Sequence, residues 1–207
     1  MPCPADLRLL AIVWASDGLG ALDDPAVEVS THGDLAAVLG LAWPDQDEIE
    51  LALRHGDVIA QVQQECSAVI PFRLGTFIRD ERELRAMLRA QRPRLVGMLE
   101  RFGGRIEMGL KLRLGGSPPH HLPSELDAIR SLTSGVDARD ERLAMVAGRR
   151  VLSGRYLIER DAVDRFWSAF DDLRAAAPDT AAMGSGPWAP YSFCDSTSDH
   201  RTGATSR

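Results

Sequence analysis

Apolar residues in the first half of the chain gather in short runs separated by polar and glycine-rich stretches. Residues 7–14 (LRLLAIVW) have a β-branched centre and predict a buried strand. Residues 27–31 and 35–39 predict two more strands, because His32-Gly33-Asp34 between them has the length and composition of a hairpin turn. Residues 67–72 (SAVIPF) predict a further short strand that ends in a turn.

Two long helices are expected in the same half. The first begins near Asp45 or Asp47, either of which can cap the free amides at its start. Its apolar residues recur near i, i+4 and i+7 and predict a stripe that faces the core: Ile49, Leu53, Ile59, Val62 and Cys66. The second begins at Asp80, is interrupted at Pro93, and stops at Gly103-Gly104.

The clearest periodicity in the chain lies in residues 105–114, where apolar residues alternate strictly with polar residues and glycine. This period of two predicts a strand with one buried and one solvent-exposed face. A short helix capped by Ser124, strands over 143–147 and 151–158, a helix from Asp161 and an extended segment over 183–193 follow. Strand, helix, strand, strand, helix, strand is the order of a ferredoxin-like fold with an antiparallel sheet.

The element order predicts an α+β protein built from two small mixed α/β domains. The first covers residues 1–103, and the second, ferredoxin-like domain covers 104–194. Residues 195–207 contain no large apolar side chain, so burial cannot offset the entropy of ordering them. They are expected to form a disordered tail.

Composition narrows the classes of function. The chain has 207 residues, of which 44% are hydrophobic and 26% charged, as in ordinary globular proteins. It has no apolar run long enough to span a membrane, no signal-peptide pattern, and three scattered cysteines, which predicts a cytoplasmic protein with free thiols. The net charge of −6 argues against nucleic-acid binding. Neither a membrane nor a nucleic acid is therefore expected as a partner.

Candidate catalytic and metal-binding residues are few. His55 and Cys66 share a helix face but lie roughly 16 Å apart along its axis, too far for a nucleophile and its base. His120-His121 has no further ligand at zinc spacing, and no phosphate-binding loop or dinucleotide fingerprint is present. We therefore expect no catalytic site, no metal and no cofactor.

A row of arginines on the second long helix is the first candidate binding surface. These residues recur at helical spacing on one face: Arg82, Arg85, Arg89 and Arg92. They either form a solvated face with local partners in Glu81 and Glu83, or they dock an acidic partner.

An aromatic segment near the C-terminus is the second candidate. Residues 186–193 contain three aromatic residues and two prolines, and the aromatic residues are Trp188, Tyr191 and Phe193. Aromatic side chains bury a large area at low entropic cost and are common interface anchors. The segment either folds back on its own sheet or binds a partner.

Three segments together resemble one protein family, the gas vesicle synthesis proteins of the L/F type. Residues 69–76 (VIPFRLGT) resemble its V-x-P-x-R-F-G-T segment, with Leu74 in place of phenylalanine. Residues 104–111 (GRIEMGLK) are similar to its G-x-x-E-x-x-V/L-K strand, and residues 186–193 (GPWAPYSF) are similar to its closing G-P-W-P-P-Y-S-F. The resemblance covers about residues 7–194, but residues 115–123 are shorter than the helical insert usual in the family.

The resemblance implies an accessory protein of gas vesicle assembly. Such a protein binds the small apolar shell protein and other gas vesicle accessory proteins, assists incorporation of the shell protein, and performs no catalysis. Its expected location is the gas vesicle and the cytoplasm. Two alternatives remain open: a regulatory protein that binds a small ligand on its ferredoxin-like sheet, and an enzyme that brings together residues such as His55, Arg73 and Glu107.

Overall fold

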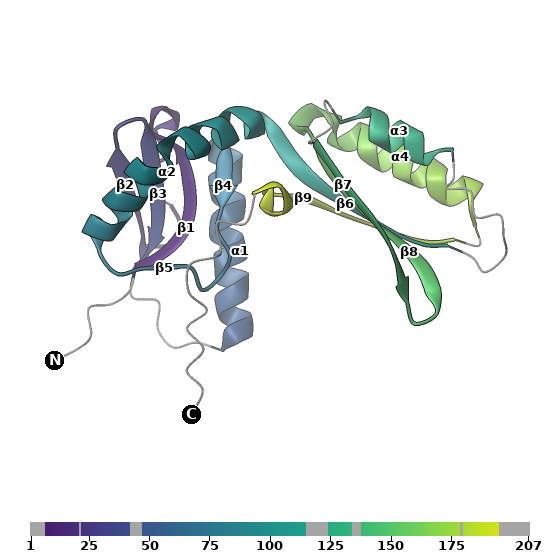
Figure 1. Cartoon of the computed structure of the whole chain (residues 1–207), viewed down its shortest axis with the longest axis horizontal. Coiled ribbons are helices and arrows are strands. Elements are labelled where there is room, and N and C mark those ends of the chain that lie inside the picture. Colours follow the sequence, from purple (N-terminus) through teal and green to yellow (C-terminus); the bar gives the residue numbers. More distant parts are fainter. Residues whose placement is uncertain are drawn as a thin grey trace.

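The computed structural model describes residues 7–20, 22–41, 47–114, 124–133, 138–178 and 180–194. The chain forms two α/β units that lie side by side, each built around its own β-sheet (Figure 1). We call them the N-terminal unit, which holds β1–β5 with α1 and α2, and the C-terminal unit, which holds β6–β9 with α3 and α4. The expected α+β class is confirmed, whereas the boundary at residues 103 and 104 stays a prediction.

The N-terminal sheet has the strand order β2-β3-β1-β4, and β5 also pairs with β1. All these pairs are antiparallel. The strands are β1 (Leu7–Trp14), β2 (Val27–His32), β3 (Leu35–Gly40), β4 (Val69–Pro71) and β5 (Phe77–Ile78). The predicted hairpin between β2 and β3 is confirmed, and Gly33 adopts a positive φ of 68° in its turn. A short 3-10 helix, η1 (Ala15–Asp17), follows β1.

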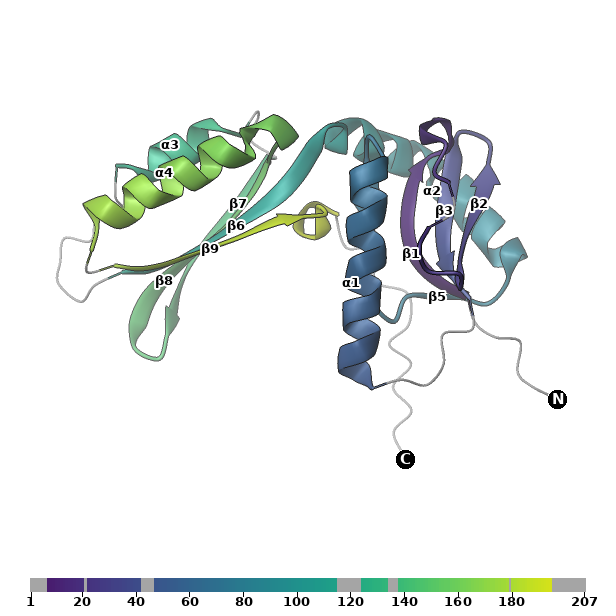
Figure 2. The same cartoon turned by 180° about the vertical axis from the view of Figure 1, so that it is seen from behind.

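Both faces of this sheet are covered by a helix. The helix α2 (Glu81–Phe102) packs on one face, where Leu9 joins its core, and α1 (Glu48–Glu65) packs on the other, where Leu10 joins a separate core. Figure 2 shows α1 standing in front of the sheet and α2 behind it. Every residue of β3 is consequently buried.

The two long helices confirm their predicted caps and correct two other expectations. Asp47 accepts a hydrogen bond from the backbone nitrogen of Ile49 at 3.1 Å, and Asp80 accepts one from Glu83 at 2.7 Å. Pro93 lies inside a continuous α2 and does not interrupt it. The predicted inner stripe of α1 is wrong at its start, because Ile49 and Leu53 face solvent with 68% and 64% of their surface exposed.

The C-terminal sheet has the order β7-β8-β6-β9, and its neighbouring strands are antiparallel. Its strands are β6 (Arg105–Leu114), β7 (Arg139–Val146), β8 (Arg149–Glu159) and β9 (Ala181–Trp188). The helix α3 (Leu126–Ser131) follows β6, and η3 (Arg160–Ala162) with α4 (Val163–Ala176) follows β8. This order and pairing are compatible with the predicted ferredoxin-like arrangement.

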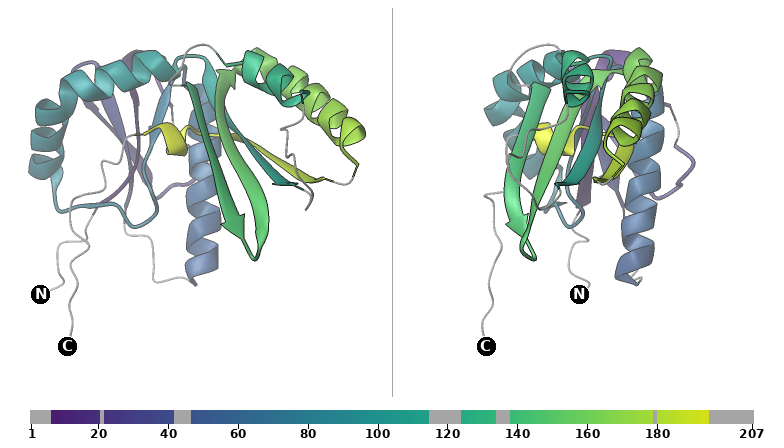
Figure 3. Two further views of the ribbon diagram at one scale, coloured as in Figure 1. Left: turned by 45° about the vertical axis from the view of Figure 1, so that its right-hand side comes forward. Right: turned by 90° about the vertical axis from the view of Figure 1, so that its right-hand side faces the viewer.

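In the parts of the chain that the structure describes, α-helices cover one face of the C-terminal sheet. Figure 3 shows α3 and α4 lying along the same face of the sheet. Met108, Leu110 and Leu112 on β6 share a core with residues of these two helices. Tyr156 on β8 and Phe166 on α4 are fully buried in the same core. Among the described residues no α-helix lies on the opposite face, so the alternating pattern of β6 reports the environment of its two sides.

None of the helices in the described parts of the chain is both long and apolar enough to cross a lipid bilayer. The predicted tail over 195–207, Asp45, His120-His121 and the shortened segment over 115–123 lie outside the described residues.

Candidate partner-binding site

The aromatic segment starts on β9 and ends in a short 3-10 helix, η4 (Tyr191–Phe193), at the junction of the two units (Figure 1). Its three rings have different environments. Trp188 is 55% exposed, Tyr191 is half-buried, and Phe193 is buried at 6% exposure. The segment therefore divides into an exposed beginning and a buried end.

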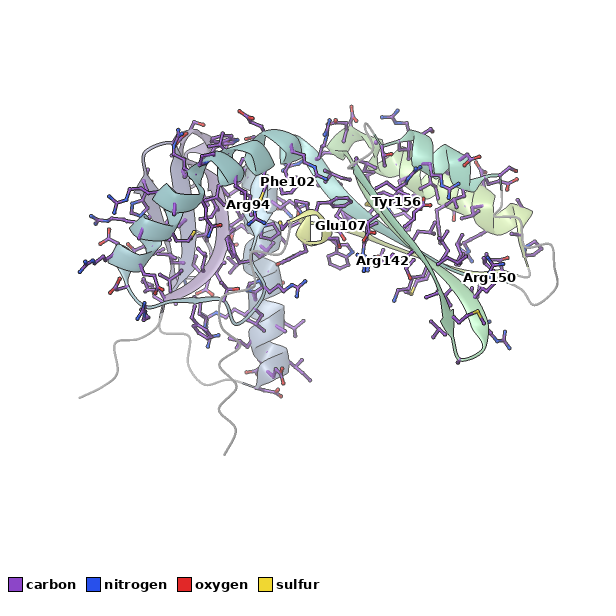
Figure 4. All side chains as sticks on the ribbon, in the orientation of Figure 1. Arg94, Phe102, Glu107, Arg142, Arg150 and Tyr156 are labelled. Atoms are coloured by element: carbon purple, nitrogen blue, oxygen red, sulfur yellow. The ribbon has the colours of Figure 1, made fainter. Side chains whose placement is uncertain are left out.

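Glu107 on β6 holds η4 in place. Its carboxylate accepts hydrogen bonds from the Ser192 backbone nitrogen at 2.8 Å and from Ser192 Oγ at 2.7 Å. Arg155 lies 3.3 Å from the same carboxylate. Burial raises the pKa of Glu107, and the bonds from Ser192 and the charge of Arg155 oppose that rise. Figure 4 shows Glu107 beside η4, where the two units meet.

Tyr191 makes the corresponding contact with the N-terminal unit. Nε2 of His55 on α1 lies 3.2 Å from the Tyr191 hydroxyl and 3.1 Å from the Phe72 carbonyl oxygen. Burial lowers the pKa of His55 and raises that of Tyr191. Both groups are therefore neutral at pH 7.

Phe193 completes the junction. It packs in the core between α2 and the N-terminal sheet, together with Leu157 of β8, and the Arg101 guanidinium lies 5.7 Å from its ring centroid. For Phe193 this placement agrees with the alternative in which the segment folds back on the protein itself, and partner binding by the three aromatic residues stays a prediction. Phe193 and the buried part of Tyr191 join the two units, and Trp188 is the ring of the three that has a large exposed area.

Trp188 lies on the face of the C-terminal sheet opposite α3 and α4, which we call the open face. Trp188 pairs with Glu107, whose neighbours Ile106 and Met108 point into the helix-covered core. Further along the same face, one row crosses all four strands and consists of Arg142, Ser153, Lys111 and Met183. Met183 is 56% exposed. This open face therefore combines apolar side chains with positive charge.

The tip of the β7–β8 hairpin adds a second apolar area to the C-terminal unit. Ala147 and Gly148 form the turn, with φ values of 48° and 73°. Three large apolar residues near the tip are exposed: Leu143, Met145 and Val146. Because β7 is an edge strand and no described strand pairs with its outer side, its outer backbone groups offer a template for another strand.

The predicted arginine row lies on α2, in the N-terminal unit. Arg92 binds Asp34 in the turn between β2 and β3, with distances of 2.5 and 3.2 Å, and Arg85 pairs with Glu81 on its own helix. Arg82 and Arg89 lie on the same helix. The arginines therefore lie in a different unit from Trp188, which belongs to β9, and form a separate surface.

Among the described residues we looked for groups that could bind a metal ion or act as a nucleophile. These residues include no group of three or more histidine, cysteine, aspartate or glutamate residues placed to hold a metal ion. Cys66 is buried at 1% exposure, and burial raises its pKa to about 12, so its thiol is protonated and inert.

Comparison with known proteins decides the family. The model of the family described as "Gas vesicle synthesis protein GvpL/GvpF" matches residues 9–143 and 120–195. The chain belongs to this family.

Curated relatives agree with this assignment, and two solved structures share the fold. The chain is 28% identical over 180 residues to gas vesicle protein F2 of Halobacterium salinarum, with 82% of this chain and 80% of the relative covered. It is 28% identical over 217 residues to gas vesicle protein L of a Streptomyces species, with 78% and 80% covered. The crystal structure of GvpF from an Anabaena species has a TM-score of 0.74 at 14% identity and covers 92% of this chain and 96% of its own. GvpF from Microcystis aeruginosa gives 0.71 at 14% identity, with 92% and 99% covered.

The three segments that resemble the GvpL/GvpF family converge on the junction between the units. In the first segment, the Phe72 carbonyl oxygen lies 3.1 Å from Nε2 of His55. In the second segment, Glu107 accepts a hydrogen bond from Ser192, which belongs to the third segment. Sequence reasoning singled out these segments but missed this structural role, since their contacts span as many as 136 positions along the chain.

Proposed function

We propose that this protein binds the small apolar shell protein of gas vesicles and assists its incorporation into the growing vesicle. Membership of the GvpL/GvpF family supports a role in gas vesicle assembly, and it does not by itself name the partner. We further propose that the protein works in the cytoplasm and at the gas vesicle, together with other gas vesicle proteins.

The observation that carries this proposal is the open face of the C-terminal sheet. Trp188 and Met183 leave 55% and 56% of their surface exposed there, on a face that no α-helix of the described residues covers. A subunit with a strongly apolar surface aggregates unless that surface is covered before assembly. An exposed sheet face with large apolar side chains is suited to cover it, and the edge strand β7 can add backbone pairing.

The test is co-purification of the shell protein with a variant that carries Trp188→Ala and Met183→Ser. We expect the recovered shell protein to fall strongly, while the free energy of unfolding changes by no more than about 0.5 kcal/mol because both side chains are exposed. The matched control is Phe77→Ala, which removes another exposed aromatic ring, on β5 of the N-terminal unit. Recovery unchanged in the folded double variant would overturn the proposal.

A further inference from the structure

A cavity of about 340 Å³ lies between the β2–β3 turn and the first half of α2. Its floor is apolar, because Leu35 and Leu88 are buried at 1% and 3% exposure. Its remaining lining is polar or charged and comprises His32, Gly33, Asp34, Arg85, Arg89 and Arg92. The cavity therefore suits a ligand that combines an apolar group with a negative charge.

The arginines around the cavity differ in how they are paired. Asp34 binds Arg92, and Glu81 binds Arg85. Arg89 donates from Nε to the Arg85 carbonyl oxygen at 3.3 Å, and no carboxylate in the described parts of the chain contacts it. A guanidinium can bind a carboxylate through two parallel N–H groups. Arg89 consequently offers a site for a carboxylate at the mouth of the cavity.

The start of α1 has the complementary chemistry. Ile49 and Leu53 lie one turn apart, and 68% and 64% of their surfaces are exposed. Glu48 and Glu50 flank Ile49 and are exposed as well. Two large aliphatic side chains beside two carboxylates are unusual on a free helix face, since soluble proteins rarely group exposed apolar residues.

These two surfaces lie at opposite ends of the N-terminal unit. The cavity is at the β2–β3 turn, where β3 begins, whereas α1 starts beyond the far end of β3 (Figures 1 and 2). One molecule therefore cannot place its own α1 in its own cavity.

We propose that the cavity receives the start of α1 from a second copy of this chain. Ile49 and Leu53 of one copy then cover the Leu35 and Leu88 floor of the other, and the neighbouring carboxylates bind Arg89. The two surfaces are different, so the contact is heterologous. Such contacts leave one free surface at each end and build rings or open chains of molecules rather than a closed twofold dimer.

Two single-surface variants test the proposal on the purified full-length protein. Arg89→Glu reverses the charge at the cavity, and Glu48→Arg with Glu50→Arg reverses it on α1. We expect wild-type protein to show an average mass above that of the monomer, rising with concentration in low-salt buffer, by sedimentation or light scattering. Each variant alone should be monomeric, with its association constant reduced about tenfold or more, because a desolvated charge pair is replaced by a repulsive one.

Mixing the two variants gives the most specific result. Each retains one intact surface, and the two reversed surfaces carry opposite charges, so an equimolar mixture is expected to recover association, with the one-to-one dimer as its smallest complex. Arg113→Glu is the matched control, because Arg113 is exposed on the C-terminal sheet, and it should associate like the wild type. Ile49→Ser with Leu53→Ser, which leaves the charges at the start of α1 unchanged, should also be monomeric.

Three results would overturn the proposal. They are a wild-type protein that stays monomeric at every concentration, variants that associate as strongly as the wild type, and a mixture that does not recover association. A cavity that serves a small carboxylate ligand would give the first of these. Circular dichroism of each variant identifies loss of folding, and in that case the mixing experiment is repeated with the serine variant in place of the α1 charge variant.

Discussion

The two sheets of this protein differ in how many of their faces are covered by α-helices. The N-terminal sheet is enclosed on both faces, whereas the C-terminal sheet has one exposed face. The N-terminal sheet lies between α1 and α2, and its strands contribute to two cores. The C-terminal sheet carries helices on one face, and its other face retains charged residues with Met183 and Trp188. Because the N-terminal sheet is covered on both faces, the proposed binding through a sheet face is assigned to the C-terminal unit.

The same difference is visible in the sequence pattern. All residues of β3 are buried, and its sequence is a continuous apolar run. In β6 the polar positions Lys111 and Arg113 are exposed, as the alternation predicts. Glu107 departs from this pattern with 4% exposure, because η4 folds over the first part of the open face.

Truncating neighbouring residues on one strand from each sheet would test this contrast with the largest expected effect. Leu9→Ala and Leu10→Ala should each lower the free energy of unfolding by about 2–5 kcal/mol, since the two side chains lie in different cores. Leu112→Ala should have a similar effect, but its neighbour Arg113→Ala should change stability by no more than about 0.5 kcal/mol. Urea unfolding measures all four. A small effect of either β1 variant would contradict the covering of both faces.

Glu107 lies on the open face but is buried, because η4 covers it there. Glu107→Ala leaves the Ser192 nitrogen and hydroxyl without an acceptor and should lower stability by about 1–3 kcal/mol. Glu107→Gln is the matched control, because its amide oxygen still accepts from Ser192 and its burial carries no charge penalty. We expect its effect to be smaller, by the same urea measurement and by limited proteolysis after residue 188. Negligible effects of both variants would mean that η4 is held without this carboxylate, whereas equal and large effects would mean that its charge beside Arg155 is what holds η4.

The pH dependence of stability sharpens the description of the junction and has the smallest expected effect. Burial lowers the pKa of His55, so the unfolded chain binds a proton that the folded protein refuses. Stability from this residue is complete above the ordinary histidine pKa of about 6.5 and is lost as the pH falls from there toward the lowered value. The slope is at most about 1.4 kcal/mol per pH unit.

A non-titrating variant, His55→Gln, isolates this contribution. Urea unfolding between pH 7.5 and pH 5.5 should show a shallower decline for the variant than for the wild type (pH values chosen about one unit either side of the ordinary pKa). Glu107 acts in the opposite direction, because its raised pKa means that protonation at low pH relieves the cost of burying its charge. Parallel curves for wild type and variant would show that His55 titrates normally.

Most secondary structure could be predicted because it depends on local pattern. The hairpin at Gly33, the caps at Asp47 and Asp80, and the alternation in β6 all report short-range physics. Which residues of α1 pack against the N-terminal sheet depends on the position of the sheet, which is not a local property of the helix sequence. The periodicity of α1 predicts one apolar stripe, but the core-facing side of the helix runs through Leu51, His55 and Val58. Ile49 and Leu53 lie outside it and are exposed.

The candidate site was predicted in part. The aromatic segment was identified from its composition, yet the division between exposed Trp188 and buried Phe193 depends on contacts with elements about 90 residues earlier in the chain. The role of Glu107 is of the same kind, since its partner Ser192 lies 85 positions away. Periodicity assigns a residue to a face of a strand, and only the fold decides what later covers that face.

The position of η4 in the chain has a consequence for biosynthesis. Phe193 leaves the ribosome after every strand and helix described above, so the two units can collapse around their own cores before the piece that joins them exists. Until residues 191–193 emerge, the carboxylate of Glu107 lacks its hydrogen bonds from Ser192, and Arg101 lacks its contact with the Phe193 ring. Among the described elements, η4 is therefore the last to make its contacts with both units.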